Sequence, residues 1–163
     1  MRWVLIVLAV AGIAVSALAL REHYRTDTSP CSINERWDCG AVNHSPFAEI
    51  GGMISVISPR SYDFVANHSP LAKIANIPVA VIGIAGYLAI AGFALARRWW
   101  IVLLLTTGAV GFSAYLTYVE ARLLETYCIW CVSSAAIICL TEIAAIAAVV
   151  RRRRYRVPVV RVR

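Results

Sequence analysis

Two pairs of cysteines are the residues of this chain that could do chemistry. Two residues separate Cys128 from Cys131, and seven separate Cys31 from Cys39. A cysteine thiolate attacks disulfides, so closely spaced thiols can exchange a disulfide with a partner or give two electrons to an oxidant. Two such pairs in one chain predict an electron relay, in which one pair passes electrons to the other.

The composition indicates which elements hold these thiols. Hydrophobic residues make up 60% of the 163 residues, charged residues only 15%, and the mean hydropathy is +0.71. This is too apolar for a soluble domain of this length, so we predict a membrane protein. Four apolar segments are long enough to cross a hydrocarbon core of about 30 Å at about 1.5 Å per residue, at residues 3–20, 77–96, 99–119 and 129–150. Each should be a helix, because the backbone finds no water there.

We therefore predict an all-α integral membrane protein with one domain at residues 1–150. This domain is a bundle of four transmembrane helices, with an extracytoplasmic loop or cap at residues 21–76 between the first two, and residues 151–163 form a basic tail. A cleaved signal peptide is the alternative for the first helix, since Arg2 precedes an apolar run and residues 17–19 form a small-residue cleavage pattern. We favour a retained helix, because the run is longer than a usual signal core.

Charge predicts the orientation, because cationic residues in short loops favour the cytoplasmic side. Ten cationic residues lie on one side of the four segments, namely Arg2, Arg97, Arg98 and seven arginines from Arg151 onward. The other side carries six cations against eight acids. Both termini are thus expected in the cytoplasm of a cell (plasma or inner) membrane, and both cysteine pairs at its outer face, where disulfides persist. The arginine tail is expected to anchor to anionic lipid, and no nucleic-acid partner is predicted.

Helical geometry groups the reactive residues of the last segment. At about 100° per residue, one stripe carries Cys128, Cys131, Ala135, Cys139 and Glu142. The opposite, lipid-facing side carries Trp130, Ser133 and Ile137. The stripe should face the bundle, with room for a planar apolar ring against Ala135. Glu142 lies too deep to protonate such a ring and should have a structural partner, and Cys139 should be a small packing residue.

The pair Cys128 and Cys131 has a physical reason to react. It opens a helix, where unpaired amide groups and the positive end of the dipole stabilise a thiolate. An inert structural disulfide and half of a zinc site are the alternatives, although zinc favours two short-spaced pairs in a water-exposed knuckle, and we predict no metal. The spacing leaves the resting state open: bonds within each pair, or a captured bond between Cys39 and Cys128, are all compatible with it.

The arrangement resembles the vitamin K epoxide reductase family over essentially residues 1–150. The resemblance rests on Cys31-x7-Cys39, Cys128-Ile-Trp-Cys131, Ser45 six residues after Cys39, and the Ile-Pro opening of residues 77–83. It implies a standalone bacterial or archaeal type of member, functionally similar to disulfide bond formation protein B.

The resemblance implies a relay that promotes disulfide formation in exported proteins. Cys31 and Cys39 would accept electrons from a thioredoxin-fold (DsbA-like) partner. Cys39 would then exchange with Cys128, and Cys131 would pass the electrons to a membrane quinone, whether menaquinone, ubiquinone or a phylloquinone-like molecule. Many bacterial members carry a fused thioredoxin-like domain where this chain has its arginine tail, so the partner is expected to be a separate protein.

The resemblance also nominates residues for the quinone site, which are Val42, Ser45, Phe47, Asn76, Tyr115, Tyr118 and Ala135. Animal members have a tyrosine at the position of Ala135, so that hydrogen bond to the quinone is not available here. Asn76, Tyr115 and Tyr118 are the candidate substitutes. A near-repeat of residues 43–50 at residues 67–74 makes Ser69 an alternative to Ser45, which we favour for its spacing from Cys39.

Two other functions stay open. The same machinery could have quinone or quinone-epoxide reduction as its main purpose, and epoxide turnover would be the sign of it. Alternatively, the protein is a non-enzymatic membrane scaffold clasped by two structural disulfides, which would resist a dithiol partner.

Overall fold

The described part of the chain is built from helices. A computed structural model describes residues 1–27, 29–52 and 75–156, so Ser69 and the second copy of the near-repeat lie outside the described residues. The elements in order are α1 (Arg2–His23), α2 (Cys39–Asn43), the 3-10 helix η1 (Pro46–Ala48), α6 (Val79–Leu95), α7 (Trp99–Val119), the π-helical turn η2 (Glu120–Leu124) and α8 (Ile129–Arg156). No strand occurs among these residues. The all-helical prediction is therefore confirmed.

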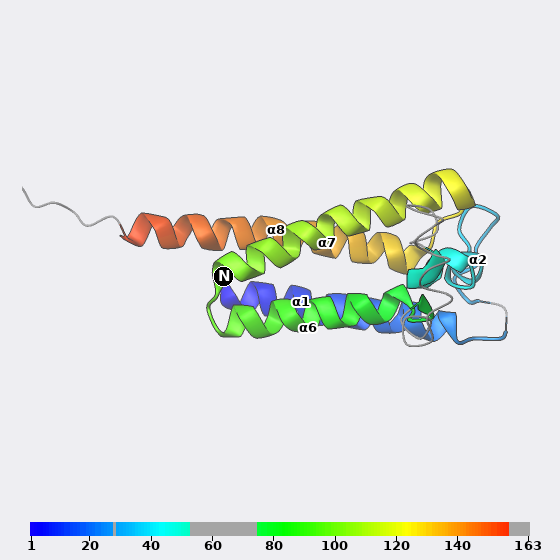
Figure 1. Ribbon diagram of the computed structural model, residues 1–163, viewed down its shortest axis with the longest axis horizontal. Helices are drawn as coiled ribbons and strands as arrows, with labels where there is room; N and C mark the ends of the chain where they lie inside the picture. Colours follow the sequence, from blue (N-terminus) through cyan, green and yellow to red (C-terminus); the bar gives the residue numbers. More distant parts are fainter. Residues whose placement is uncertain (28, 53–74, 157–163) are drawn as a thin grey trace, which may run out of the picture.

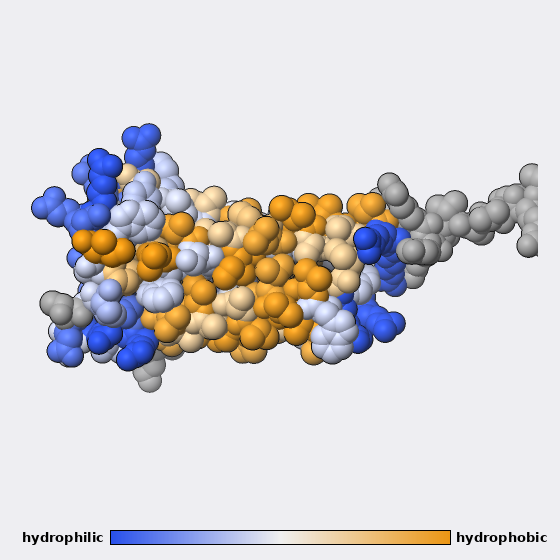
Figure 2. All heavy atoms as spheres, turned by 180° about the vertical axis from the view of Figure 1, so that it is seen from behind, coloured by the Kyte–Doolittle hydropathy of each residue, from blue (hydrophilic) through white to orange (hydrophobic). Residues whose placement is uncertain are grey.

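The long helices have the character of membrane spans. Three are long and apolar enough to cross a membrane, at Arg2–His23, Trp99–Leu124 and Ile129–Arg152. α6 is also apolar, but its 17 residues are at the short end of what spans a core of about 30 Å. Figure 2 shows a band of apolar residues across the middle of one face, with hydrophilic residues at both ends. This is a helical membrane protein, and a count of four spans remains a prediction.

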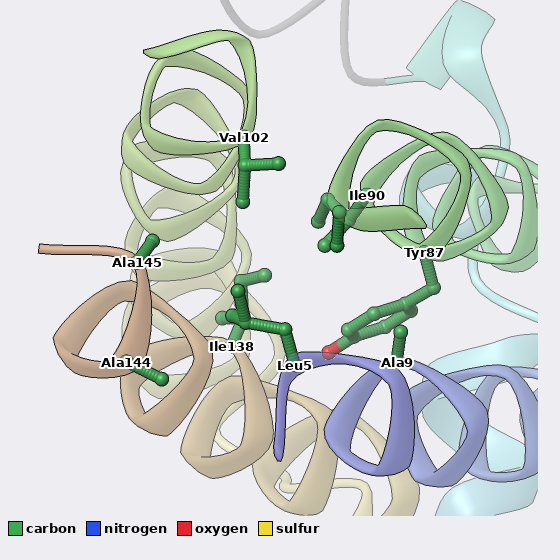
Figure 3. Close-up of a cluster of buried hydrophobic side chains, with 9 residues drawn as sticks. Leu5, Ala9, Tyr87, Ile90, Val102, Ile138, Ala144 and Ala145 are labelled. Carbon is green, nitrogen blue, oxygen red and sulfur yellow. The ribbon is translucent and has the colours of Figure 1, made fainter. Parts of the chain in front are cut away.

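α1 packs against both α6 and α8, and α7 packs against α8 and α6 (Figure 1). The bundle core is the buried apolar cluster between them, made of Leu5, Ala9, Tyr87, Ile90, Ala94, Val102, Ile138, Ala144 and Ala145. Figure 3 shows the labelled members of this cluster on the four helices, with Leu5, Tyr87 and Ile138 pointing toward one another. Because lipid tails are as apolar as these side chains, close packing and hydrogen bonds rather than escape from water hold such a bundle together.

Small residues and hydroxyl groups allow the helices to approach closely. A Cβ atom at Gly12 would lie 2.3 Å from the ring of Tyr87, so only glycine permits this crossing of α1 and α6. The Tyr87 hydroxyl donates to the backbone oxygen of Ser134, at 3.0 Å, and joins α6 to α8. Glu142 of α8 accepts hydrogen bonds from Thr106 and Thr107 of α7. Glu142 thus has structural partners, as we expected for an acid so deep in the helix.

The bundle presents different residues at its two ends. The N-terminus, the turn between α6 and α7, and the C-terminal part of α8 lie at one end in Figure 1, and α2 lies at the other. The first end carries the exposed arginines Arg97, Arg98, Arg151 and Arg152. The second end holds both cysteine pairs, because α1 ends and α8 begins there.

Candidate functional site

The loop pair is held in a small cap that follows α1. Cys31 and Cys39 form a disulfide, and Cys39 is the first residue of α2. The Asp38 side chain caps this helix by accepting from the Ala41 amide at 3.1 Å, and it accepts a second bond from the Ser32 hydroxyl at 2.5 Å. The Ser32 hydroxyl and then the Ala41 amide lower the pKa of Asp38, because both bonds favour its charged form.

Backbone hydrogen bonds attach the cap to the segment that precedes α8. The Tyr127 amide donates to the oxygen of Arg36 at 2.8 Å, and the Asp38 amide donates to the oxygen of Tyr127 at 3.2 Å. The ring of Trp37 also lies 5.6 Å from that of Tyr127, centroid to centroid. These contacts fix the start of α2 beside the start of α8, so the two cysteine pairs meet.

The structure brings all four cysteines into one place. We call Cys31, Cys39, Val42 and Cys128 the cysteine cluster; they are buried together, with Leu124, Trp130 and Cys131 packed against them. Cys128 and Cys131 are free thiols. The described structure therefore has a bond within the loop pair and none within the membrane pair or between Cys39 and Cys128.

The surroundings of Cys128 favour its thiolate. A hydrogen bond from the Cys131 thiol lowers the pKa of Cys128, and the amides of Cys131 and Trp130 lower it further, against the effects of burial and of Glu120. The side-chain amide of Asn43 also donates to its sulfur, at 3.4 Å. The start of α8 thus stabilises a thiolate at Cys128, which directly precedes that helix.

An apolar cavity of about 310 Å³ opens beside the pair and has Cys131 in its wall. Of the residues predicted for the quinone site, Val42, Ser45 and Phe47 line this cavity. The other four do not belong to the wall that the described residues form: Asn76 and Tyr118 are exposed, and Tyr115 and Ala135 are half-buried. The structure therefore groups three of the seven predicted residues around Cys131.

The predicted face of α8 was right in part. Cys131 lines the cavity and Glu142 bonds to α7, as predicted. The prediction was wrong for Trp130, placed toward lipid, which lines the cavity, for Ile137, which packs against the bundle core, and for Cys139, which is exposed. The buried residues of α8 instead include Ile138, Thr141, Ala145 and Ala148. α8 packs against both α1 and α7, so its buried face is not the single stripe that the cysteines mark.

Sequence reasoning missed two residues that contact the membrane pair. Asn43 follows Cys39 by four residues, and besides Cys128 its amide bonds to the oxygen of Cys39 at 2.9 Å. Glu120 is only 3% exposed, lines the cavity, and accepts from the Cys128 amide at 3.5 Å. The available signal for Glu120 was a carboxyl group at the end of an apolar segment, eight residues before Cys128.

Comparisons with known proteins give one result. The model of the vitamin K epoxide reductase family matches residues 3–146, which is most of the chain. A search of curated proteins finds no match.

Among the described residues, no group of three or more histidine, cysteine or acidic side chains could hold a metal ion.

Proposed function

Since this chain belongs to the vitamin K epoxide reductase family, we propose that it takes electrons from a separate thioredoxin-fold protein and passes them to a membrane quinone. Disulfide formation in exported proteins is the purpose that this relay serves. One observation carries the proposal: the oxidised pair Cys31–Cys39 packs against a reduced pair, and Cys131 of that pair lines an apolar cavity.

Burial supports a division of labour within the loop pair. Cys31 retains 8% of its surface and Cys39 none, so a thiolate of the partner attacks Cys31 and releases Cys39. The partner's second thiol then attacks the partner sulfur that is bonded to Cys31. Cys31 is released, and the partner leaves with its two sulfurs joined in a disulfide. The loop pair is now reduced, and the partner has lost two electrons.

The same cluster supports transfer from the loop pair to the membrane pair. Cys39 attacks a Cys128–Cys131 disulfide at Cys128, its neighbour in the cluster, and Cys131 leaves as a thiolate. Attack of Cys31 on Cys39 restores the loop disulfide and frees Cys128. The product has the thiol states of the described structure, with the loop pair bonded and the membrane pair free.

The cavity fits a quinone ring by size and by chemistry. Its volume of about 310 Å³ is within the range of roughly 300–1,000 Å³ that is usual for small-molecule sites. Val42, Phe47 and Trp130 would hold the ring, and the buried Trp130 Nε1–H, without an acceptor among the described residues, is free to donate to a carbonyl oxygen. A bound quinone supplies the two-electron acceptor that returns Cys128 and Cys131 to a disulfide.

We further propose four spans, α1, α6, α7 with η2, and α8, within a membrane domain at residues 1–150. Arginines at the N-terminal end of the bundle support cytoplasmic termini. The cysteine cluster would then lie at the outer face of the cell membrane, where a thioredoxin-fold partner of the exported compartment has access to Cys31.

Quinone reduction by the purified protein in detergent tests the function. The donor is a reduced thioredoxin-fold dithiol protein, and the variants are Cys131→Ala and Cys31→Ala. We expect turnover by the intact protein and none by Cys131→Ala. Cys31→Ala should lose the protein donor but still accept electrons from a small dithiol.

The control is Cys139→Ala, which removes the exposed free thiol and should change nothing. If the intact protein never reduces quinone and its disulfide resists the donor, the protein is a clasped scaffold and the proposal is wrong. Turnover of a quinone epoxide far faster than of quinone would make epoxide reduction the main activity instead.

A further inference from the structure

Glu120 is a buried carboxyl group that the relay of cysteines leaves without a role. It is 3% exposed, and burying a charged carboxylate without a partner of opposite charge is unfavourable. The one ion pair among the described residues joins Arg25 to Glu22, and Arg122, two residues beyond Glu120, is exposed. The position therefore calls for an explanation other than an ion pair.

The group that bonds the Glu120 carboxyl belongs to the redox pair. The Cys128 amide donates to its Oε2 at 3.5 Å, and Glu120 shares the cavity wall with Cys131. The local fold creates this arrangement: α7 passes into the π-helical turn η2, and Glu125, in the left-handed conformation at φ 53°, reverses the chain toward α8. The carboxyl thus reaches back to the first turn of α8.

Cys131 and Glu120 lie in the wall of the same cavity, and Glu120 also bonds to the amide of the other thiol residue, Cys128. When Cys131 gives up its electrons, its proton has to leave the sulfur. Glu120 is the carboxyl group that this cavity wall offers to receive it.

We propose that Glu120 carries the proton of the membrane pair, accepting it from Cys131 Sγ as the Cys128–Cys131 bond forms and giving it to the acceptor in the cavity. This inference rests on the proposed function. Two thiols lose two electrons and two protons to form a disulfide, and a quinone gains two of each to become a hydroquinone. Glu120 carries one proton; Cys128 releases the other to water on becoming a thiolate, and the acceptor takes its second from water.

The other titratable groups around the cavity do not contact the thiols. From α1, the His23 Nδ1 is bonded to the backbone oxygen of Asn43 at 2.6 Å. From α6, the Tyr87 hydroxyl is bonded to Ser134. From α8 and the residue before it, the facing groups are Cys131 and Cys128 themselves. Within the described residues, Glu120 is therefore the acid–base group in place at Cys131.

The test compares Glu120→Gln, which keeps an oxygen for the Cys128 amide but cannot carry a proton, with Glu142→Gln as the matched control. Glu142 is an acid within α8 that bonds to two threonines of α7. We expect Glu120→Gln to reduce quinone about 100-fold more slowly, the usual scale of general acid–base catalysis, and Glu142→Gln to keep its rate per folded molecule.

A measurement without quinone separates proton transfer from a structural effect. Infrared difference spectra between the oxidised and reduced membrane pair should contain a carboxyl signal that is lost in Glu120→Gln and kept in Glu142→Gln. Glu120→Asp keeps the acid, so it should keep the signal at a shifted position and recover part of the rate. It also replaces Glu120→Gln if that variant does not fold.

The outcomes distinguish the two proposals. If the intact protein reduces no quinone, the proposed function fails. If the intact protein works but Glu120→Gln works equally fast, or is slow while its carboxyl signal is unchanged, then the role of Glu120 as proton carrier is wrong and the relay stands.

Discussion

The bundle core and the cysteine cluster are both buried, but they differ in how their polar atoms are used. In the bundle core the one polar side-chain atom, the Tyr87 hydroxyl, is bonded to Ser134. Around the cysteine cluster, free thiols, an uncompensated carboxyl and an indole N–H without an acceptor in the described structure lie together. The core is arranged for stability, whereas the cluster keeps groups available for a reaction.

The connections of the two regions differ as well. The bundle core lies between four helices, which pack against one another through many side chains along their length. The cysteine cluster joins helix beginnings and a capped loop, whose positions depend on single hydrogen bonds such as that of Asp38 to Ala41. We therefore expect substitutions in the core to change stability and substitutions in the cluster to change chemistry.

The largest expected effect is in the bundle core. Leu5 is fully buried, and Leu5→Ala leaves a cavity there. Because the transfer from water does not contribute inside a membrane, mainly the cavity term remains, and we expect a loss of roughly 1–3 kcal/mol in unfolding free energy. Unfolding in a denaturing detergent measures it.

The control for this prediction is Leu104→Ala on α7, because Leu104 is 74% exposed. That variant should unfold like the intact protein. Quinone reduction per folded molecule should be the same in both variants. A Leu5→Ala protein that is fully stable but inactive would contradict the separation of the two regions.

A medium effect is expected from Trp130, which lies at the border of the cysteine cluster. Trp130→Phe keeps an aromatic ring in the cavity wall but removes the Nε1–H, which has no acceptor among the described residues. A hydrogen bond of about 1 kcal/mol to a quinone oxygen would be lost, so we expect roughly fivefold weaker quinone binding with little change in stability. A titration with quinone in detergent, read by protein fluorescence, measures the affinity.

Trp99→Phe is the matched control, since Trp99 packs against the bundle core and does not belong to the described cavity wall. Its quinone affinity should equal that of the intact protein. If Trp130→Phe binds quinone as tightly as Trp99→Phe, the indole N–H is not the ring's polar ligand.

The two regions also differ in how far the sequence predicted them. The spans came from apolar runs, which depend only on composition, and α7 begins at Trp99 and ends at Val119 as predicted. α8 continues to Arg156, beyond the predicted boundary at residue 150. Arginine is a good helix former, so the arginines after residue 150 end the apolar segment but not the helix.

The candidate site was harder to predict, because it depends on details of one or two residues. The four cysteines were recognisable from their spacing, but the side of α8 that carries Trp130 faces inward because α8 packs against both α1 and α7. Glu120 is followed by the charged residues Arg122 and Glu125, which in the sequence suggest an exposed loop. No periodic pattern of apolar residues predicts the π-helical turn that directs Glu120 inward. Sequence patterns therefore predicted which cysteines to consider, and the structure brings these together, but the patterns did not predict the side chains that surround them.

The smallest effect is expected from the cap, where Asp38 holds the start of α2. Its pKa is lowered, first by the Ser32 hydroxyl and then by the Ala41 amide. A carboxyl group whose pKa is lower in the folded state stabilises the fold above its unfolded pKa, here 3.8, and loses that contribution as the pH falls through the folded pKa. The cap should therefore open more easily below about pH 4.

The rate at which a phosphine reduces the Cys31–Cys39 disulfide between pH 5 and pH 3 measures this opening, because Cys39 is fully buried at the start of α2. Asp38→Asn should be reduced faster than Asp27→Asn at pH 5, and the ratio of the two rates should fall toward one at pH 3, where Asp38 is protonated and no longer holds the cap. Asp27→Asn, at an exposed position of the same loop, should follow the intact protein, and dividing by its rate removes the pH dependence of the phosphine itself. Equal profiles for Asp38→Asn and Asp27→Asn would mean that the disulfide, rather than the cap, holds this end of the molecule together.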